Sequence, residues 1–161
     1  MYQGRELKAF QPGGASAPIL PADKRQVPMD FEHLAAAGSM LGSAAVIVMD
    51  ETTCLVRATL RLAKFFNHES CGQCTPCREG TNWSEMVLRR IEEGAGGAGD
   101  PELLLRMTTN MIGTTLCPLA DAAVGPIRSL VESFRPELEQ HIDEGACPLP
   151  PPRYFQEAET G

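Results

Sequence analysis

Three cysteines at strict three-residue intervals are the side chains of this sequence best suited to chemistry. Cys71, Cys74 and Cys77 lie in the run ESCGQCTPCREG, and Cys117, forty residues after the last of them, is followed at once by Pro118. Three close thiolates and one distant thiolate next to a proline are typical ligands of a cubane iron–sulfur cluster. The spacing therefore predicts one 4Fe-4S cluster bound by Cys71, Cys74, Cys77 and Cys117.

Two other uses of these cysteines stay open. Four thiolates also suit tetrahedral zinc, which would make the chain a non-redox binding module with a structural metal. Zinc sites usually take their cysteines from two separate Cys-x-x-Cys pairs, whereas here the split is three plus one. Disulfides are the third use, but the N-terminal residues MYQGRE carry no apolar signal segment, and six cysteines in an unsecreted chain indicate metal ligands first.

Three cysteines compete for the role of fourth ligand. Cys117 directly precedes a predicted helix, whose dipole and free N–H groups favour a negatively charged cluster. Cys147 is also followed by a proline, but it belongs to a Pro-rich tail in which nothing defines its geometry. Cys54 is predicted on a helix, where a lone cysteine usually behaves as a small core hydrophobe. We therefore expect Cys117 to be the fourth ligand.

Residues around the cysteine loop have less specific interpretations. Arg78 and Glu79 either offset the charge of the cluster and contact a partner, or are surface charges at a helix start; both interpretations stay open. His68 is expected to be a C-terminal helix residue rather than an iron ligand. The run GAGGAG at 94–99 matches the dinucleotide fingerprint by letter, but it lacks the preceding strand, so we predict a helix–helix linker.

The first fifty residues predict a small β-containing unit. We expect strands at 7–10, 17–20 and 44–49, with a turn at the PGG of 12–14. The third run is apolar and rich in β-branched residues, which predicts a strand buried on both faces. Three strands are few for a sheet that stands alone, so we interpret 1–50 as part of a domain that begins before Met1.

From residue 51 the hydrophobic period becomes helical. Asp50 and Thr52 are N-cap types for the first helix, and further helices are expected after the cysteine loop, from Asp100, from Pro118 and from Pro136. Gly125-Pro126 is expected to break or kink the fourth helix. The side chains expected to face inwards are Leu55, Ala58, Leu62, Phe65, Trp83, Met86, Val87, Ile91, Leu103, Leu104, Met107, Met111, Leu119, Ala122, Ala123, Ile127, Leu130, Val131, Phe134, Leu138 and Ile142.

Composition excludes several classes of function. The net charge of -7 argues against a nucleic-acid surface, which needs clustered Lys and Arg. No run of about 18 apolar residues exists, so we expect no direct membrane insertion. Hydrophobic residues make up 43% of the chain and aromatic ones only 6%, so the expected core is aliphatic. No nucleophile–base pair or phosphate loop is visible, which argues against bond-making chemistry by this chain alone.

Two segments carry a family resemblance. FNHESCGQCTPCREGT at 66–81 and TLCPLADAA at 115–123 resemble the NADH-binding flavoprotein subunit of respiratory complex I, NADH:quinone oxidoreductase. PGGASAP at 12–18 and GSMLG at 38–42 are similar to its middle region, a β-grasp-like ligand-binding domain. The resemblance covers residues 4 to about 142. The wider family includes diaphorase subunits of NAD-reducing hydrogenases and β subunits of NAD-dependent formate dehydrogenases.

The resemblance implies an α+β fold and a role in electron relay. It implies a partial β-grasp-like domain at 1–50 and a 4Fe-4S-binding bundle of four to five helices at 51–144. A Pro-rich tail, which we expect to be extended or disordered, occupies 145–161. The ligands of the family carry over to Cys71, Cys74, Cys77 and Cys117, and their cluster takes single electrons from FMN and passes them to a second iron–sulfur subunit.

The flavin- and NADH-binding domain of that family finds no counterpart in this sequence. FMN and NADH are therefore expected only on a missing N-terminal part or on a partner chain, and we do not expect this chain to catalyse alone. The predicted location is cytoplasmic, peripheral to the inner membrane through the assembled complex. The alternative function is a diaphorase module of a NAD-reducing hydrogenase or formate dehydrogenase.

Overall fold

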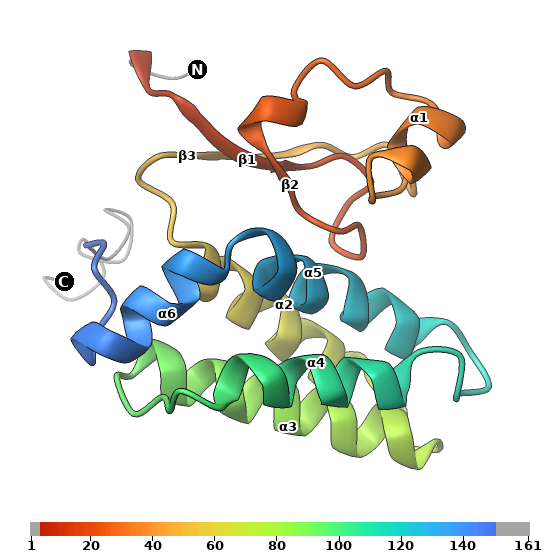
Figure 1. Cartoon of the computed structure of the whole chain (residues 1–161). Helices are drawn as coiled ribbons and strands as arrows, with labels where there is room; N and C mark the ends of the chain where they lie inside the picture. The colour runs from red at the N-terminus through yellow and green to blue at the C-terminus, as the bar shows by residue number, and fades with distance from the viewer. Residues whose placement is uncertain (1–3, 151–161) are drawn as a thin grey trace, which may run out of the picture.

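The computed structural model describes residues 4–150 as a small sheet packed on a bundle of helices (Figure 1). The sheet has three antiparallel strands in the order β2-β1-β3. The strands are β1 (Leu7–Gln11), β2 (Leu20–Pro21) and β3 (Ile47–Asp50), and a 3-10 turn, η2 (Ala22–Lys24), follows β2. A short helix, α1 (Phe31–Ala36), lies in the same lobe, capped by the Asp30 side chain, which accepts from the His33 N–H.

The five helices of the bundle follow one another along the chain. They are α2 (Leu55–Glu69), α3 (Thr75–Glu92), α4 (Asp100–Met111), α5 (Leu119–Ser133) and α6 (Arg135–Glu144). The predicted α+β class and the predicted helix count are therefore confirmed. The glycine-rich run at 94–99 connects α3 to α4, as expected for a linker.

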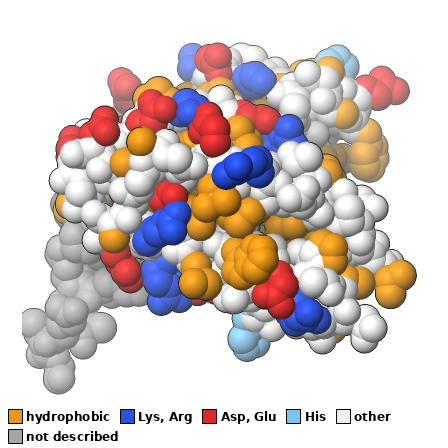
Figure 2. All heavy atoms as spheres, turned by 60° about the horizontal axis from the view of Figure 1, so that its bottom comes forward, with side chains coloured by type: hydrophobic (Ala, Val, Ile, Leu, Met, Phe, Trp, Pro, Cys, Tyr) orange, Lys and Arg blue, Asp and Glu red, His pale blue; other side chains and the backbone are white. Residues whose placement is uncertain are grey.

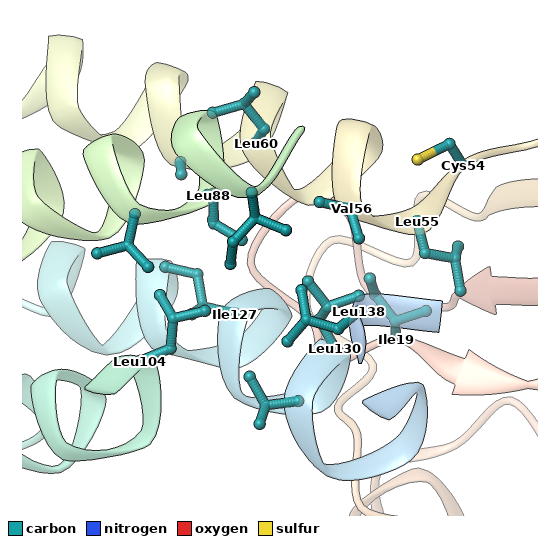
Figure 3. Packing of buried hydrophobic residues seen from close by; sticks show 14 of the residues in the cluster. Ile19, Cys54, Leu55, Val56, Leu60, Leu88, Leu104, Ile127, Leu130 and Leu138 are labelled. Carbon is teal, nitrogen blue, oxygen red and sulfur yellow. The ribbon is translucent and has the colours of Figure 1, made fainter. Parts of the chain in front are cut away.

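One hydrophobic core joins the bundle to the sheet (Figure 3). Leu60, Leu88 and Leu104 contribute to it from three different helices, and Ile19 joins it from the sheet lobe. Each fully buried side chain of this size stabilises the fold by about 1.5–3 kcal/mol. The core is aliphatic, in line with the low aromatic content. It fixes the relative positions of the helix ends, where the chemistry-bearing residues lie.

The third strand differs from its prediction. β3 is shorter than expected, and it is not buried on both faces: Ile47 is 39% exposed and Val48 55%. The reason is its place at the edge of the sheet, where it pairs only with β1 through Phe10↔Val48 and Ala9↔Met49. Only Met49 faces the core. An apolar β-branched run indicates a strand but does not tell how many faces its neighbours cover.

The inward faces of α2 and α3 are also shifted from the prediction. Phe65, Trp83 and Met86, expected inside, are 50%, 52% and 58% exposed. Leu55, Val87 and Ile91 are buried as expected, and the other buried positions are Val56, Thr59, Leu60, Ala63, Phe66, Cys77, Gly80, Thr81, Ser84 and Leu88. Apolar residues cover more than half the circumference of both helices, so packing against the neighbouring helices determines which face is buried. α3 lies low in Figure 1, and Figure 2, which brings the bottom forward, shows hydrophobic side chains at the surface among charged ones.

The sequence predicts a break or a kink at Gly125-Pro126, and the helix is not broken there: α5 continues through it to Ser133. Gly125 lies so close to the sheet lobe that an added Cβ would come within 2.5 Å of the Ser16 carbonyl oxygen. The Ser129 hydroxyl accepts from the Ile19 N–H at 2.8 Å and donates to the Pro126 carbonyl at 3.1 Å. Packing against the sheet therefore maintains a helix that loses one hydrogen bond at its proline.

The first helix of the bundle begins later than predicted. Asp50 does not cap it; its carboxylate accepts from the Thr52 N–H at 3.0 Å and organises the preceding turn. The N-cap is Cys54, whose Sγ accepts from the Arg57 N–H at 3.2 Å. Cys54 is buried in the main core, as the sequence predicts, but as the N-cap it also places its sulfur against polar groups.

Candidate iron–sulfur centre

The cysteine loop connects the end of α2 to the start of α3. Cys71 lies in the loop, Cys74 is the N-cap of α3, and Cys77 falls in the first turn of that helix. Pro76 stands at the second helical position, where its missing N–H costs nothing because the first N–H groups of a helix have no internal partner. The motif therefore presents its sulfur atoms around a helix N-terminus, whose free N–H groups favour negative charge.

Backbone contacts hold the loop in a defined shape. Gly72 has a φ of +78°, a conformation that suits glycine. The Arg78 guanidinium donates to the Gly72 carbonyl at 2.7 Å, and it also donates to the Glu79 carboxylate at 2.9 Å. The Ser70 hydroxyl lies 3.3 Å from Cys77 Sγ. The Arg78 side chain therefore closes the loop over six residues.

The segment that carries Cys117 lies next to this loop. The Leu116 N–H donates to Cys74 Sγ at 3.4 Å, across 42 residues of sequence. Cys74 and Cys77 also belong to the same hydrophobic cluster as Leu119 and Ala120, from the first turn of α5. The structure thus places the segment that carries Cys117 beside the cysteine loop.

Contacts behind the two helix starts position the second segment. An added Cβ on Gly80 would come within 2.6 Å of the Met111 side chain, so α3 and the end of α4 pack very closely there. The chain then turns at Gly113, whose N–H donates to the Asp121 carboxylate on α5 at 2.7 Å. The Thr115 hydroxyl donates to the Cys117 carbonyl at 2.9 Å. Cys117 therefore occupies a braced turn just before the N-cap of α5.

The residues present fit an iron–sulfur cluster. All four cysteines are free thiols; Cys71 and Cys117 are exposed, Cys74 is half-buried and Cys77 is buried. A cluster needs thiolate ligands and hydrogen-bond donors aimed at sulfur, and Cys74 Sγ already accepts a backbone N–H from the opposite segment. His68 is exposed in the last turn of α2 and pairs with Glu69, as expected for a residue at the helix C-terminus.

The other two cysteines lie at the opposite end of the bundle. Cys54 begins α2, whereas the cysteine loop follows the end of this 15-residue helix. A helix of that length spans about 22 Å at 1.5 Å per residue. The sequence predicts Cys147 in a tail without defined geometry, yet Cys147 and Leu149 pack against the main core. The rest of the predicted tail, 151–161, lies outside the described residues.

Comparisons with known proteins show the family of the chain. The family described as "NADH-ubiquinone oxidoreductase-F iron-sulfur binding region" matches residues 57–141. The F 2 subunit of NADH-quinone oxidoreductase from Rhizobium meliloti (strain 1021) is 51% identical over 146 residues, 91% of this chain and 35% of that protein. The F subunit of the same oxidoreductase from Mycobacterium tuberculosis (strain ATCC 25618 / H37Rv) is 45% identical over 148 residues, 92% of this chain and 33% of that protein.

A solved structure has the same fold. A chain of an NAD+-reducing NiFe hydrogenase in the air-oxidized state matches with a TM-score of 0.77 and 31% identity, covering 86% of this chain and 24% of that one. The present chain spans about a third of the length of the curated relatives that it matches. The family match begins before the three-cysteine motif and ends beyond Cys117. The chain therefore belongs to the family of NADH-ubiquinone oxidoreductase-F iron–sulfur binding regions.

Proposed function

We propose that this chain is the electron-relay part of an NADH dehydrogenase of the complex I type. In this proposal Cys71, Cys74, Cys77 and Cys117 bind one 4Fe-4S cluster, which takes electrons one at a time from FMN and passes them to a partner subunit. The observation that carries the proposal is the Leu116 N–H contact to Cys74 Sγ, because it joins the three-cysteine loop to the Cys117 segment. Membership of an iron–sulfur-binding family supports it.

The cluster would supply one-electron transfer, and the protein would supply its position and its electrostatic surroundings. Cys74 and Cys77 lie at the N-terminus of α3, and Cys117 directly precedes the N-cap of α5, so the positive ends of two helix dipoles would act on the cluster. The Ser70 hydroxyl and the Leu116 N–H lie within hydrogen-bonding distance of cysteine sulfur atoms. Hydrogen bonds to sulfur and partial exposure are two factors by which a protein tunes the reduction potential of a cluster.

The exposed end of the bundle is where a redox partner would approach. Cys71 and Cys117 are exposed, and Leu116 beside them is 88% exposed. In this proposal the electron donor is a flavin- and NADH-binding domain or chain, and the acceptor is a second iron–sulfur subunit. Within residues 4–150, no helix is long and apolar enough to cross a membrane. The proposed location is the cytoplasmic side of the inner membrane, with attachment through partner subunits.

A diaphorase module of an NAD-reducing hydrogenase is the second candidate. The match to NAD+-reducing hydrogenase structures in two redox states, with TM-scores of 0.77 and 0.74, favours it. The same four cysteines and the same cluster would serve both functions. The identity of the subunit that accepts the electrons therefore distinguishes the two candidate functions. Co-purification with quinone-reducing subunits supports the first candidate, and co-purification with a hydrogenase supports the second.

Anaerobic purification tests the shared part of both candidates. We expect a brown protein with about four iron and four acid-labile sulfide per chain, and a reduced-state EPR signal of a 4Fe-4S cluster. A matched variant, Cys74→Ser, is expected to lose the cluster, whereas the exposed His68→Gln is expected to keep it. A colourless chain that binds one zinc at the cysteine loop would contradict electron relay and favour a structural role.

A further inference from the structure

Four side chains with metal-ligating atoms gather at the end of the bundle opposite the cysteine loop. They are Cys54, Glu92, His141 and Cys147, and one ligand atom of each lies within 4.8 Å of all the others. Cys54 Sγ is 3.2 Å from His141 Nε2 and 3.7 Å from Glu92 Oε2, and these last two atoms are 3.5 Å apart. From this geometry we infer a second metal site, which binds one zinc ion or a similar divalent cation through these four residues.

The fold explains why residues so far apart in sequence meet. α2 and α3 form an antiparallel hairpin, so Cys54 at the start of α2 lies near Glu92 at the end of α3. The chain after α3 and the chain after α6 then touch at two glycines. An added Cβ on Gly94 would come within 1.9 Å of the Gly145 carbonyl oxygen. This close approach brings Cys147, two residues after Gly145, to the side of Glu92.

The distances suit tetrahedral zinc. Zinc binds Cys sulfur at about 2.3 Å and His nitrogen or carboxylate oxygen at about 2.0–2.2 Å, so neighbouring ligand atoms stand about 3.3–3.8 Å apart. The three distances among Cys54, Glu92 and His141 are 3.2, 3.5 and 3.7 Å. Cys147 lies within the 4.8 Å limit and closes the set. Two sulfurs, one nitrogen and one oxygen are a ligand mixture that zinc accepts.

Outer contacts orient the ligand atoms toward one another. His141 Nδ1 lies 2.7 Å from the Glu137 carbonyl oxygen, so this nitrogen donates and Nε2 faces Cys54. Arg57 Nε donates to Glu92 Oε1 at 2.7 Å, which leaves Oε2 on the side of His141. A ring nitrogen that donates to a backbone carbonyl, and a carboxylate held by its second oxygen, are the outer contacts that metal ligands commonly have.

Charge balance supports a divalent cation. Two thiolates and one carboxylate bring three negative charges into a mostly buried site, with His141 fully buried. A zinc ion contributes two positive charges and Arg57 the third. Arg57 also donates to the Pro150 carbonyl at 3.2 Å, so it connects the site to the end of the described chain. Binding would release protons, because zinc takes thiolates and neutral imidazole as ligands.

The metal-free group has a definite protonation pattern. Burial raises the pKa of the Cys54 thiol, so this sulfur keeps its proton. Burial opposes a charge on His141, but hydrogen bonds with Cys54 and Glu92 raise the pKa of the imidazole to about 11. Burial also opposes a charge on Glu92, but its hydrogen bonds with His141 and Arg57 outweigh this and lower its pKa. A metal-free network of thiol, imidazolium and carboxylate is therefore one competing description, and a Cys54–Cys147 disulfide is another.

The role of the ion would be structural. Four protein ligands complete a tetrahedral shell and leave no open position for a substrate. The ligands come from the start of α2, the end of α3, α6 and the segment after it, so the ion would fasten the C-terminal segment to the bundle. The site lies a helix length from the cysteine loop. It therefore does not depend on the proposed electron relay.

Elemental analysis of the intact chain, purified anaerobically with its iron–sulfur cluster, tests the inference. We expect about one zinc per chain in addition to the iron. Zinc is expected to fall at least tenfold in Glu92→Gln, His141→Gln and Cys147→Ser, with iron unchanged. Glu93→Gln and His68→Gln are matched controls at exposed positions and are expected to keep the zinc. Of these variants, Cys147→Ser is the least expected to disturb folding, because Cys147 is half-buried and follows the last helix. Loss of zinc in this variant therefore reports on the site rather than on misfolding.

Cobalt provides the second measurement. Co2+ supplied in place of zinc is expected to give the visible absorption of a tetrahedral cobalt thiolate site, and Cys147→Ser is expected to abolish it while Glu93→Gln keeps it. A chain without stoichiometric zinc and without this cobalt spectrum would overturn the inference in favour of the metal-free network. A Cys54–Cys147 disulfide found by mass spectrometry in the native protein would overturn it too.

Discussion

The two ends of the α2–α3 hairpin differ in how far apart in sequence their metal-binding candidates lie and in how exposed these residues are. At one end, three of the four cysteines fall within seven residues of sequence, and two of the four are exposed. At the other end, the four proposed ligands span positions 54 to 147, none is exposed, and each comes from a different element. A local motif predicts the first site from the sequence. The proposed second site would form only after the bundle has folded.

The polar surroundings of sulfur differ in the same way. Near the cysteine loop, Cys74 and Cys77 meet a backbone N–H and a hydroxyl. At the far end, Cys54 meets an imidazole and a carboxylate, with Arg57 beside them. Donors aimed at sulfur suit a cluster with negative charge, whereas carboxylate and thiolate together suit a bare cation. One hairpin can therefore position two metal sites that share no ligand.

The largest expected effect is the complete loss of one metal centre in each of two variants, with the other centre retained. Cys77→Ser is expected to abolish the cluster, because it removes a buried ligand, and to leave the zinc. Cys147→Ser is expected to remove the zinc and leave the cluster. Iron, sulfide and zinc analysis of both variants checks this. Loss of both metals in both variants would mean that the two ends are not independent.

Removal of iron is expected to lower the stability of the bundle without unfolding it. A cross-link across the forty residues from Cys77 to Cys117 stabilises by about 4 kcal/mol in the chain-entropy estimate. Chelation of iron should therefore lower the melting temperature by roughly 10 °C for a domain of this size. Calorimetry before and after anaerobic chelation measures the shift. An unchanged melting temperature would show that the bundle does not depend on the cluster.

The close approach at the far end predicts a smaller effect. Gly94 has a φ of +78°, and an added Cβ would come within 1.9 Å of the Gly145 carbonyl oxygen. Gly94→Ala is expected to lower the free energy of unfolding by about 2–4 kcal/mol, from backbone strain and displacement of the facing segment. Gly97→Ala, with nothing within 4 Å, is the control and should change it by less than about 1 kcal/mol. Urea unfolding compares them, and equal stability would remove this explanation of how Cys147 is positioned.

The smallest effect is expected at the cysteine loop. Arg78→Ala removes the hydrogen bond to the Gly72 carbonyl, which contributes about 1 kcal/mol at a partly exposed position. We expect the cluster to assemble normally but to be lost about fivefold faster in air, because a loss of about 1 kcal/mol corresponds to a fivefold change in rate. Decay of the cluster absorbance measures the rate. Arg106→Ala, at an exposed position on α4, is the control, and equal decay of both variants would assign Arg78 to the surface.

Much of the helical part could be predicted from local signals. Proline and glycine mark the ends of the helices, as at Pro136 and Gly113, and the cysteine spacing marks the loop. The inward faces of α4, α5 and α6 could be predicted, but parts of those of α2 and α3 could not, because Phe65 and Trp83 are as apolar as their buried neighbours and only packing distinguishes them. For the same reason Pro126 does not end α5: contacts with the sheet lobe outweigh one lost hydrogen bond.

The second site had almost no local signal. Cys54 and Cys147 each stand without a neighbouring cysteine, and Glu92 and His141 are ordinary helix residues in the sequence. The one available clue was Gly94 together with Gly145, which marks a place where two backbones can approach. Pairing those two glycines requires knowing that α3 and α6 end side by side. Packing of the hydrophobic core determines that arrangement, and the four proposed ligands do not.

The most direct test of the four-cysteine centre is the reduced-state EPR spectrum of Cys117→Ala, purified anaerobically beside the unaltered protein. Cys117 is joined to the cysteine loop only through the fold, by way of the Leu116 contact to Cys74 Sγ. We expect the 4Fe-4S signal of the unaltered protein to be absent from the variant, with zinc content unchanged. A variant with the same signal at the same intensity would contradict the four-cysteine centre.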